Sequence, residues 1–167
     1  MNKVSIIGTG SVGSTIAYTL TVMGLASEIV MIDINNEKAL GEALDIRQGT
    51  PFCGACSIYA GDYRDAVNSD IVIVTSGIAR KGATFYAVSV SVCHICKCLL
   101  GGIDTTMTVS TMMHGEYGIE NVALSTLNMV GHEGVRGKVN VPMTDEEVML
   151  LRKSADTLKD VISNLEI

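Results

Sequence analysis

Apolar residues in the first half of the chain occur as short runs that end at, or directly before, a glycine or an acidic residue. The first two runs span residues 3–8 and 28–33, and two more span 57–60 and 70–77. Runs of this kind are typical of buried parallel strands. Between the first two runs, residues at helical spacing are Val12, Ile16, Leu20 and Met23. A second helix is expected after the second run, and strands that alternate with helices predict a doubly wound parallel sheet.

The pattern changes after residue 81. Residues 85–99 have helical periodicity, whereas 105–113 and 122–130 alternate like strands, and 138–141 reads as a third strand. Successive strands with short turns predict an antiparallel meander. The fold class predicted from both halves is therefore α/β: a four-stranded parallel sheet followed by a helix, an antiparallel meander and a C-terminal helix.

The C-terminal helix has a clear start signal. Thr144 and Glu147 form a capping-box pair. The apolar residues that follow at helical spacing are Val148, Leu151, Ala155, Leu158, Ile162 and Leu165. We expect these six side chains to form one packed face.

Composition and charge exclude several classes of protein. Apolar residues make up 47% of the 167 residues and charged residues 18%, so the chain is not disordered. A formal net charge of −6 argues against a nucleic-acid partner. No apolar run approaches the length of a membrane span, and the N-terminus holds no export signal. Five cysteines without such a signal favour reduced thiols and a cytoplasmic location.

The segment GTGSVG carries the strongest functional signal. Gly8, Gly10 and Gly13 form G-x-G-x-x-G between a predicted strand and a predicted helix, and Asp33 follows twenty residues after Gly13. The glycines permit a tight turn, the approach of a pyrophosphate and close packing of helix on sheet, while the acid meets the ribose hydroxyls. A carboxylate at this point favours NAD over NADP. A glycine turn without a ligand would leave Asp33 unexplained.

Other residues with chemical potential have simpler interpretations. The pairs Cys53/Cys56 and Cys93/Cys96 lie too far apart in sequence for a zinc ribbon, and the second pair lies among apolar residues. We assign no metal site. The three histidines lack an orienting carboxylate nearby in the sequence; they are His94, His114 and His132. We therefore assign no catalytic residue.

Long segments of the chain closely resemble bacterial NAD-dependent L-lactate dehydrogenases. The matching segments are MNKVSIIGTGSVGSTIAYTL, SEIVMIDI, ALDIRQGTPF, AGDYRDAVNSDIVIVTSGIAR, KGATFYA, GEYGIENVALS and DEEVMLLRKSADTLK. The resemblance is discontinuous, because a long central block of the family is missing between Arg80 and Gly82. It implies a truncated dinucleotide-binding domain of the Rossmann type at 1–80 and the C-terminal part of the substrate domain at 81–167.

The missing block carries most of the family's catalytic groups. In the family it holds a mobile loop with an arginine that polarises the substrate carbonyl, and the last two strands of the nucleotide domain. It also holds an aspartate, an arginine that binds the substrate carboxylate and a histidine in Gly-x-His-Gly. The resemblance implies that His114 and Arg80 match other positions of the family, so neither is a catalytic counterpart.

What the resemblance retains is cofactor recognition. It implies that Val12 and the glycines meet the pyrophosphate and that Asp33 holds the adenosine ribose. The other implied cofactor positions are Lys38, Tyr63, Gly77, Ile78 and Val88. Thr84 matches a threonine that lines the substrate pocket; simple packing is the alternative interpretation of Thr84 and Val88.

Three hypotheses about function follow. The chain is an oxidoreductase of the L-lactate dehydrogenase family, whose members transfer hydride between NAD and a small 2-hydroxy acid. Alternatively, it is a non-catalytic NAD-binding remnant, which could arise from an internal deletion, from engineering or from a faulty gene model, or it is a structural or partner-binding module. Without two strands beside 70–77, an apolar edge is open to another chain, and we expect self-association.

Overall fold

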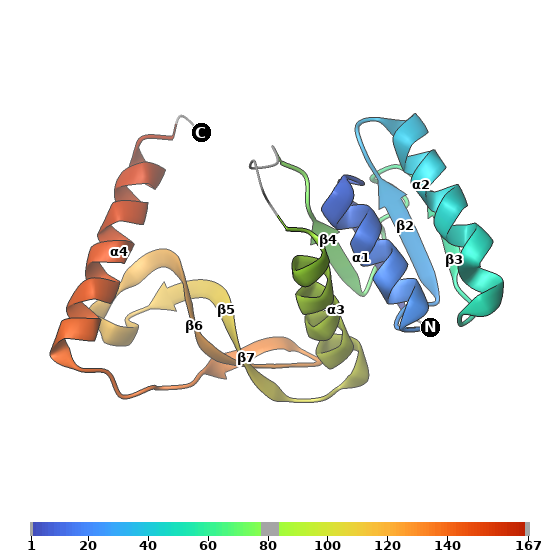
Figure 1. The fold of residues 1–167 in the computed structure, drawn as a ribbon. Coiled ribbons are helices and arrows are strands. Elements are labelled where there is room, and N and C mark those ends of the chain that lie inside the picture. The colour runs from blue at the N-terminus through green and yellow to red at the C-terminus, as the bar shows by residue number, and fades with distance from the viewer. Residues whose placement is uncertain (1, 78–83, 166–167) are drawn as a thin grey trace. The chain divides into compact units, whose positions relative to one another are not determined.

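The computed structural model describes residues 2–77 and 84–165 and divides the chain into two compact units, Met1–Gly102 and Ile103–Ile167 (Figure 1). The first unit contains a parallel four-stranded sheet in the order β3-β2-β1-β4. Its strands are β1 (Lys3–Ile7), β2 (Glu28–Ile32), β3 (Ser57–Ala60) and β4 (Ile71–Val74). The predicted parallel sheet is confirmed.

Three helices complete the first unit: α1 (Ser11–Val22), α2 (Asn36–Gly49) and α3 (Tyr86–Gly101). A short 3-10 helix, η1 (Thr50–Phe52), precedes β3. Helix α1 packs against both α2 and α3 (Figure 1). The buried core between helices and sheet includes Ile6, Ile16, Leu20, Met31, Ile58 and Ile73.

The other face of the sheet is covered unevenly. Over the two central strands, Ser5 on β1 forms a 2.7 Å hydrogen bond with Ser69, and Gly61 lies against Val30 on β2. On β4, by contrast, Val72 is 49% exposed and Val74 is 65% exposed. The segment between β3 and β4 therefore covers the middle of this face and leaves β4 open.

Helix α3 belongs to the first unit, so the two units divide later in the chain than the sequence predicts. The Ser89 hydroxyl lies 3.4 Å from the Val12 carbonyl oxygen, and the Cys93 thiol lies 3.8 Å from that of Ile16. These contacts attach α3 to α1, so the compact units divide after Gly102. The family resemblance places the domain boundary at 80/81, and that boundary falls outside the described residues.

The second unit is an antiparallel meander in the order β5-β6-β7, followed by a helix. Its elements are β5 (Thr105–His114), the 3-10 helix η2 (Glu116–Gly118), β6 (Glu120–Gly131), β7 (Gly134–Lys138) and α4 (Asp145–Ser163). The predicted third strand at 138–141 is wrong in position: β7 begins at Gly134, directly after a two-residue turn. Pairing of Gly134 with Gly131 sets this register, and the glycine-rich strand has no apolar alternation that would reveal it.

Helix α4 covers only part of the meander. The capping box of Thr144 and Glu147 is present as predicted. Ala155 is buried against β6, and Leu151 packs beside it. The later residues of the expected apolar face are 39–56% exposed: Leu158, Ile162 and Leu165. Only the first part of the predicted apolar face of α4 is therefore packed, and its later part is exposed. Among the described residues, no helix is both long enough and apolar enough to cross a membrane.

Candidate functional site

The carboxyl ends of β1, β2 and β4 meet at one edge of the parallel sheet, where open α/β sheets bind ligands. A cavity of about 460 Å³ lies there. Six residues predicted from the sequence line it: Gly8, Gly10, Asp33, Lys38, Tyr63 and Gly77. The structure thus brings together positions that span seventy residues of the chain.

Two of the motif glycines are required by the protein's own packing. Gly8 has φ +98°, and a Cβ there would lie 2.7 Å from the Ser76 backbone nitrogen. A Cβ on Gly13 would overlap the Gly8 carbonyl oxygen and approach the Thr75 hydroxyl to 2.9 Å. That hydroxyl donates a 2.8 Å hydrogen bond to the same carbonyl. Larger residues at either position would therefore force the turn away from β4.

Gly10 differs from these two glycines. Its φ of −69° suits any residue, and a Cβ there would meet no atom of the described chain within 4 Å. Gly10 is the N-cap of α1, no described side chain caps this helix, and its first turn has no acidic residue. A free helix N-terminus attracts anions through its N–H groups and its dipole. The glycine thus keeps open a surface at which a pyrophosphate fits.

Asp33 is held in place by the glycine turn. Its carboxylate accepts hydrogen bonds from the Thr9 N–H at 2.6 Å, the Thr9 hydroxyl at 3.0 Å and the Asn35 N–H at 2.9 Å. The Asn35 N–H and then the Thr9 N–H lower the pKa of Asp33. The carboxylate is therefore ionised near neutral pH, half-buried at the cavity wall, and able to accept further hydrogen bonds from hydroxyls.

A second cavity of about 460 Å³ shares Asp33 and Tyr63 with the first. Its remaining lining residues are Ile32, Asn36, Ala60, Gly61 and Asp62. The two cavities extend on either side of Asp33 along the carboxyl ends of the strands. An extended ligand with a hydroxylated centre fits this arrangement.

Sequence reasoning missed several residues of the site. Thr9 was not assigned a role, although its N–H and hydroxyl both donate hydrogen bonds to the Asp33 carboxylate. Thr75 and Ser76 line the first cavity, as do Ile7 and Ile34. The available signal for Thr75 and Ser76 was their place directly after a predicted strand, since parallel strands end at a common edge.

Four other predicted residues lie away from the cavity lining. Gly13 is buried within α1, and Val12 packs against the core. Thr84 and Val88 lie just before and within the first turn of α3, where both are exposed, and neither lines the two cavities. Ile78 lies outside the described residues.

The histidines and cysteines do not assemble a reaction centre in the part of the chain described. His94 lies on α3, His114 at the end of β5 and His132 in the β6–β7 turn; all three are exposed. Burial raises the pKa of the Cys93 thiol to about 12 and that of Cys96 to about 11, so both stay protonated. No described group of three or more His, Cys, Asp or Glu side chains is arranged to hold a metal ion.

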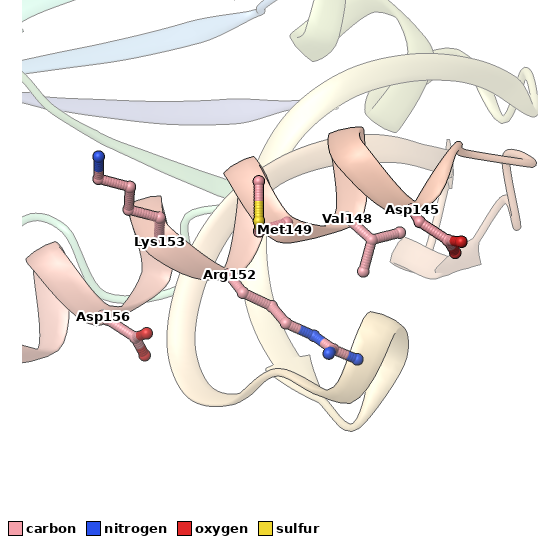
Figure 2. A pocket seen from close by; sticks show the side chains of 6 residues that line it. All are labelled: Asp145, Val148, Met149, Arg152, Lys153 and Asp156. Carbon is pink, nitrogen blue, oxygen red and sulfur yellow. The ribbon is translucent and has the colours of Figure 1, made fainter.

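A further cavity of about 460 Å³ lies along α4 (Figure 2). Figure 2 shows that Arg152 and Lys153 extend to different sides of the helix, so the charged side chains do not converge. Arg152 donates a 2.8 Å hydrogen bond to the Tyr117 carbonyl oxygen, which gives it a structural role. The candidate site therefore remains the edge of the parallel sheet.

Family models match both parts of the chain. Residues 2–84 match the NAD binding domain of lactate/malate dehydrogenases, and residues 73–166 match the alpha/beta C-terminal domain of the same family. The match to the NAD binding domain supports NAD as the cofactor of this chain.

Individual relatives with the same family name are also similar to this chain in sequence. An L-lactate dehydrogenase of Acetivibrio thermocellus is 26% identical over 311 residues, covering 100% of this chain and 98% of the relative. An L-lactate dehydrogenase of Clostridium perfringens (strain SM101) is 55% identical over 80 residues, covering 48% of this chain and 25% of the relative. The first alignment is far longer than this chain of 167 residues, so many of its positions hold no residue of this protein.

Solved structures share the fold. A minor L-lactate dehydrogenase of Enterococcus mundtii has a TM-score of 0.93 at 19% identity, covering 99% of each chain. The malate dehydrogenase of Archaeoglobus fulgidus, solved with NADH, has a TM-score of 0.91 at 19% identity, covering 99% of this chain and 100% of that one. These similarities confirm the α/β architecture.

Proposed function

Because the chain belongs to the lactate/malate dehydrogenase family, we propose that it is an internally deleted form that binds NAD and lacks the groups for hydride transfer to a 2-keto acid. The observation that carries the binding part is Gly10. No contact within the described protein requires a glycine there, whereas a pyrophosphate at the uncapped start of α1 would.

Different residues of the cavity are proposed to contact different parts of NAD. The N–H groups at the start of α1 hold the pyrophosphate, with Val12 and the three glycines beside it. Asp33, fixed by Thr9, accepts hydrogen bonds from the adenosine ribose hydroxyls and repels a 2′-phosphate. Lys38 and Tyr63 border the adenine side, and Gly77 runs beneath the dinucleotide. When bound, NAD supplies a nicotinamide that accepts or donates hydride.

The part of the site proposed to hold the nicotinamide is the less enclosed part. Val88 is proposed to meet the ring and Thr84 to border the substrate, but both are exposed at the start of α3. The deletion explains this exposure, because the family's remaining walls belong to the missing block. The deletion is supported by the long gapped alignment with the Acetivibrio relative, in which both ends of this chain are aligned.

Partners and location belong to the same proposal. The exposed apolar residues of β4 support self-association of the chain, and a small 2-hydroxy or 2-keto acid is the substrate class that the family name implies. Five free cysteines support a cytoplasmic location, since reduced thiols persist there. A partner-binding remnant without cofactor is the second candidate, which the half-exposed apolar face of α4 favours.

Replacing the carboxylate of Asp33 tests the ribose contact. We expect Asp33→Asn to weaken NAD binding by about ten- to a hundredfold, because hydrogen bonds to a charged group contribute about 1.5–3 kcal/mol. Asp45→Asn, the same change at an exposed position of α2, is the matched control and should bind like the parent. Calorimetric titration measures both, and equal affinities of the Asp33 variant and the parent would contradict the assignment.

The lowered pKa of Asp33 predicts a pH dependence of stability. A carboxylate whose pKa is depressed on folding stabilises the protein above its unfolded pKa of about 3.9. This contribution is lost as the pH falls through the folded pKa. The difference in melting temperature between the parent and Asp33→Asn should therefore be constant from neutral pH to about 5 and shrink below it. A difference that changes between pH 7 and 5 would refute the prediction.

A further inference from the structure

Strand β4 ends the parallel sheet on one side. It pairs with β1 from Val4↔Ile71 to Ile7↔Val74, and in the described part of the chain no strand pairs with its other edge. The N–H and C=O groups along such an edge are a template for another strand.

The side chains of β4 do not protect this edge from pairing with another strand. Ile73 faces the helices, whereas Val72 and Val74 are 49% and 65% exposed on the opposite face. The strand IVIV carries no charge, proline or bulge, which are the devices that protect edges. The other edge strand, β3, differs because its one exposed residue is the polar Ser57.

We propose that β4 pairs antiparallel with β4 of a second copy of this chain, so that two four-stranded sheets become one of eight strands. The inference rests on the self-association in the proposed function and names its surface. A two-fold axis perpendicular to the sheet keeps each face on its own side. Residues opposite each other must then share a face, because side chains alternate along a strand.

Several registers satisfy this condition, but only one places both exposed valines opposite valines. Ile73 lies opposite Ile73 of the second copy, so Val72 of each copy lies opposite Val74 of the other. β-branched pairs of this kind stabilise antiparallel strands. The next pairs outward are Ile71 with Thr75 and Asp70 with Ser76. No like charges oppose each other, so a second copy is a complementary partner for this edge.

The register permits a test by charge. Val72→Lys combined with Val74→Lys places two lysines opposite two lysines, and we expect this variant to be monomeric where the parent is dimeric. Val72→Lys combined with Val74→Glu places unlike charges opposite each other at both pairs, and we expect it to dimerise again. Ser57→Lys, on the exposed start of β3, is the matched control and should leave the dimer intact.

Sedimentation velocity over a wide range of concentration gives the readout, with far-UV circular dichroism and ADP-ribose binding to verify that each variant is folded. A parent that stays monomeric would overturn both the proposed self-association and this interface. A dimeric parent whose two-lysine variant remains dimeric would overturn the interface alone. Loss of the dimer without recovery in the lysine–glutamate variant would overturn the register.

Discussion

The purified chain, supplied with pyruvate and NADH, should oxidise NADH no faster than a sample without protein. Reduction of a keto acid needs a nicotinamide held against the carbonyl carbon and a cation that fixes the carboxylate, a role suited to a bidentate arginine. It also needs a donor to the carbonyl oxygen and an acid with a pKa near neutrality. In the described residues the three histidines lie exposed on separate elements.

The expected loss is large. Removing the general acid alone costs about a hundred- to ten-thousand-fold in rate. Removing the cation that orients the substrate also removes much of the advantage of positioning. Since such groups act as a unit, the losses need not multiply, but any of them brings the rate close to background.

NADH absorbance measures this rate, with protein verified by intact mass so that no host dehydrogenase contributes. Turnover at ordinary enzymatic rates would contradict the account, above all if it disappeared in one of three variants: His94→Ala, His114→Ala or His132→Ala. Such a result would mean that the chain has rebuilt a reaction centre from residues outside the family's pattern.

The second large effect is a contrast between two glycines three residues apart. Gly13→Ala should lower the melting temperature by about 10–20 °C, because overpacking against fixed backbone costs about 3 kcal/mol at the upper end of its usual range. The added Cβ meets the Gly8 carbonyl and the Thr75 hydroxyl, and neither can move without disturbing the turn or β4.

Gly10→Ala should behave in the opposite way. Its added Cβ meets no described atom within 4 Å, so the melting temperature should stay within about 2–4 °C, as for a substitution worth 0.5 kcal/mol. NAD affinity should fall at least about tenfold, because the methyl group occupies the approach of the pyrophosphate. Thermal melts and calorimetry separate the two effects. A Gly10→Ala variant that binds NAD like the parent would remove the main support for the pyrophosphate assignment.

Local signals predicted the first unit well. The glycine turn, the strand before it and Asp33 lie within one βαβ segment, so their spacing alone placed them at one sheet edge. The capping box of Thr144 and Glu147 was equally local. Thr9 was missed because its role depends on meeting a carboxylate 24 residues away.

The second unit was harder to predict because its register depends on pairing between strands. Nothing in the composition of Gly134–Lys138 distinguishes a strand from a loop, and only its ladder with β6 does so. Periodicity also predicted one packed face for α4, yet periodicity gives the direction of side chains and not the extent of the surface opposite. Leu158 and Ile162 are exposed for that reason.

We propose that cofactor recognition survives in the adenosine half of the site while the nicotinamide half is incomplete. Calorimetric titration of the mass-verified chain with NAD and, separately, with ADP-ribose tests it most directly. We expect both ligands to bind with nearly the same weak affinity, since both carry the pyrophosphate and the ribose that is proposed to meet Asp33. NAD binding much tighter than ADP-ribose binding would contradict this proposal, because contacts with the nicotinamide would then contribute most of the affinity.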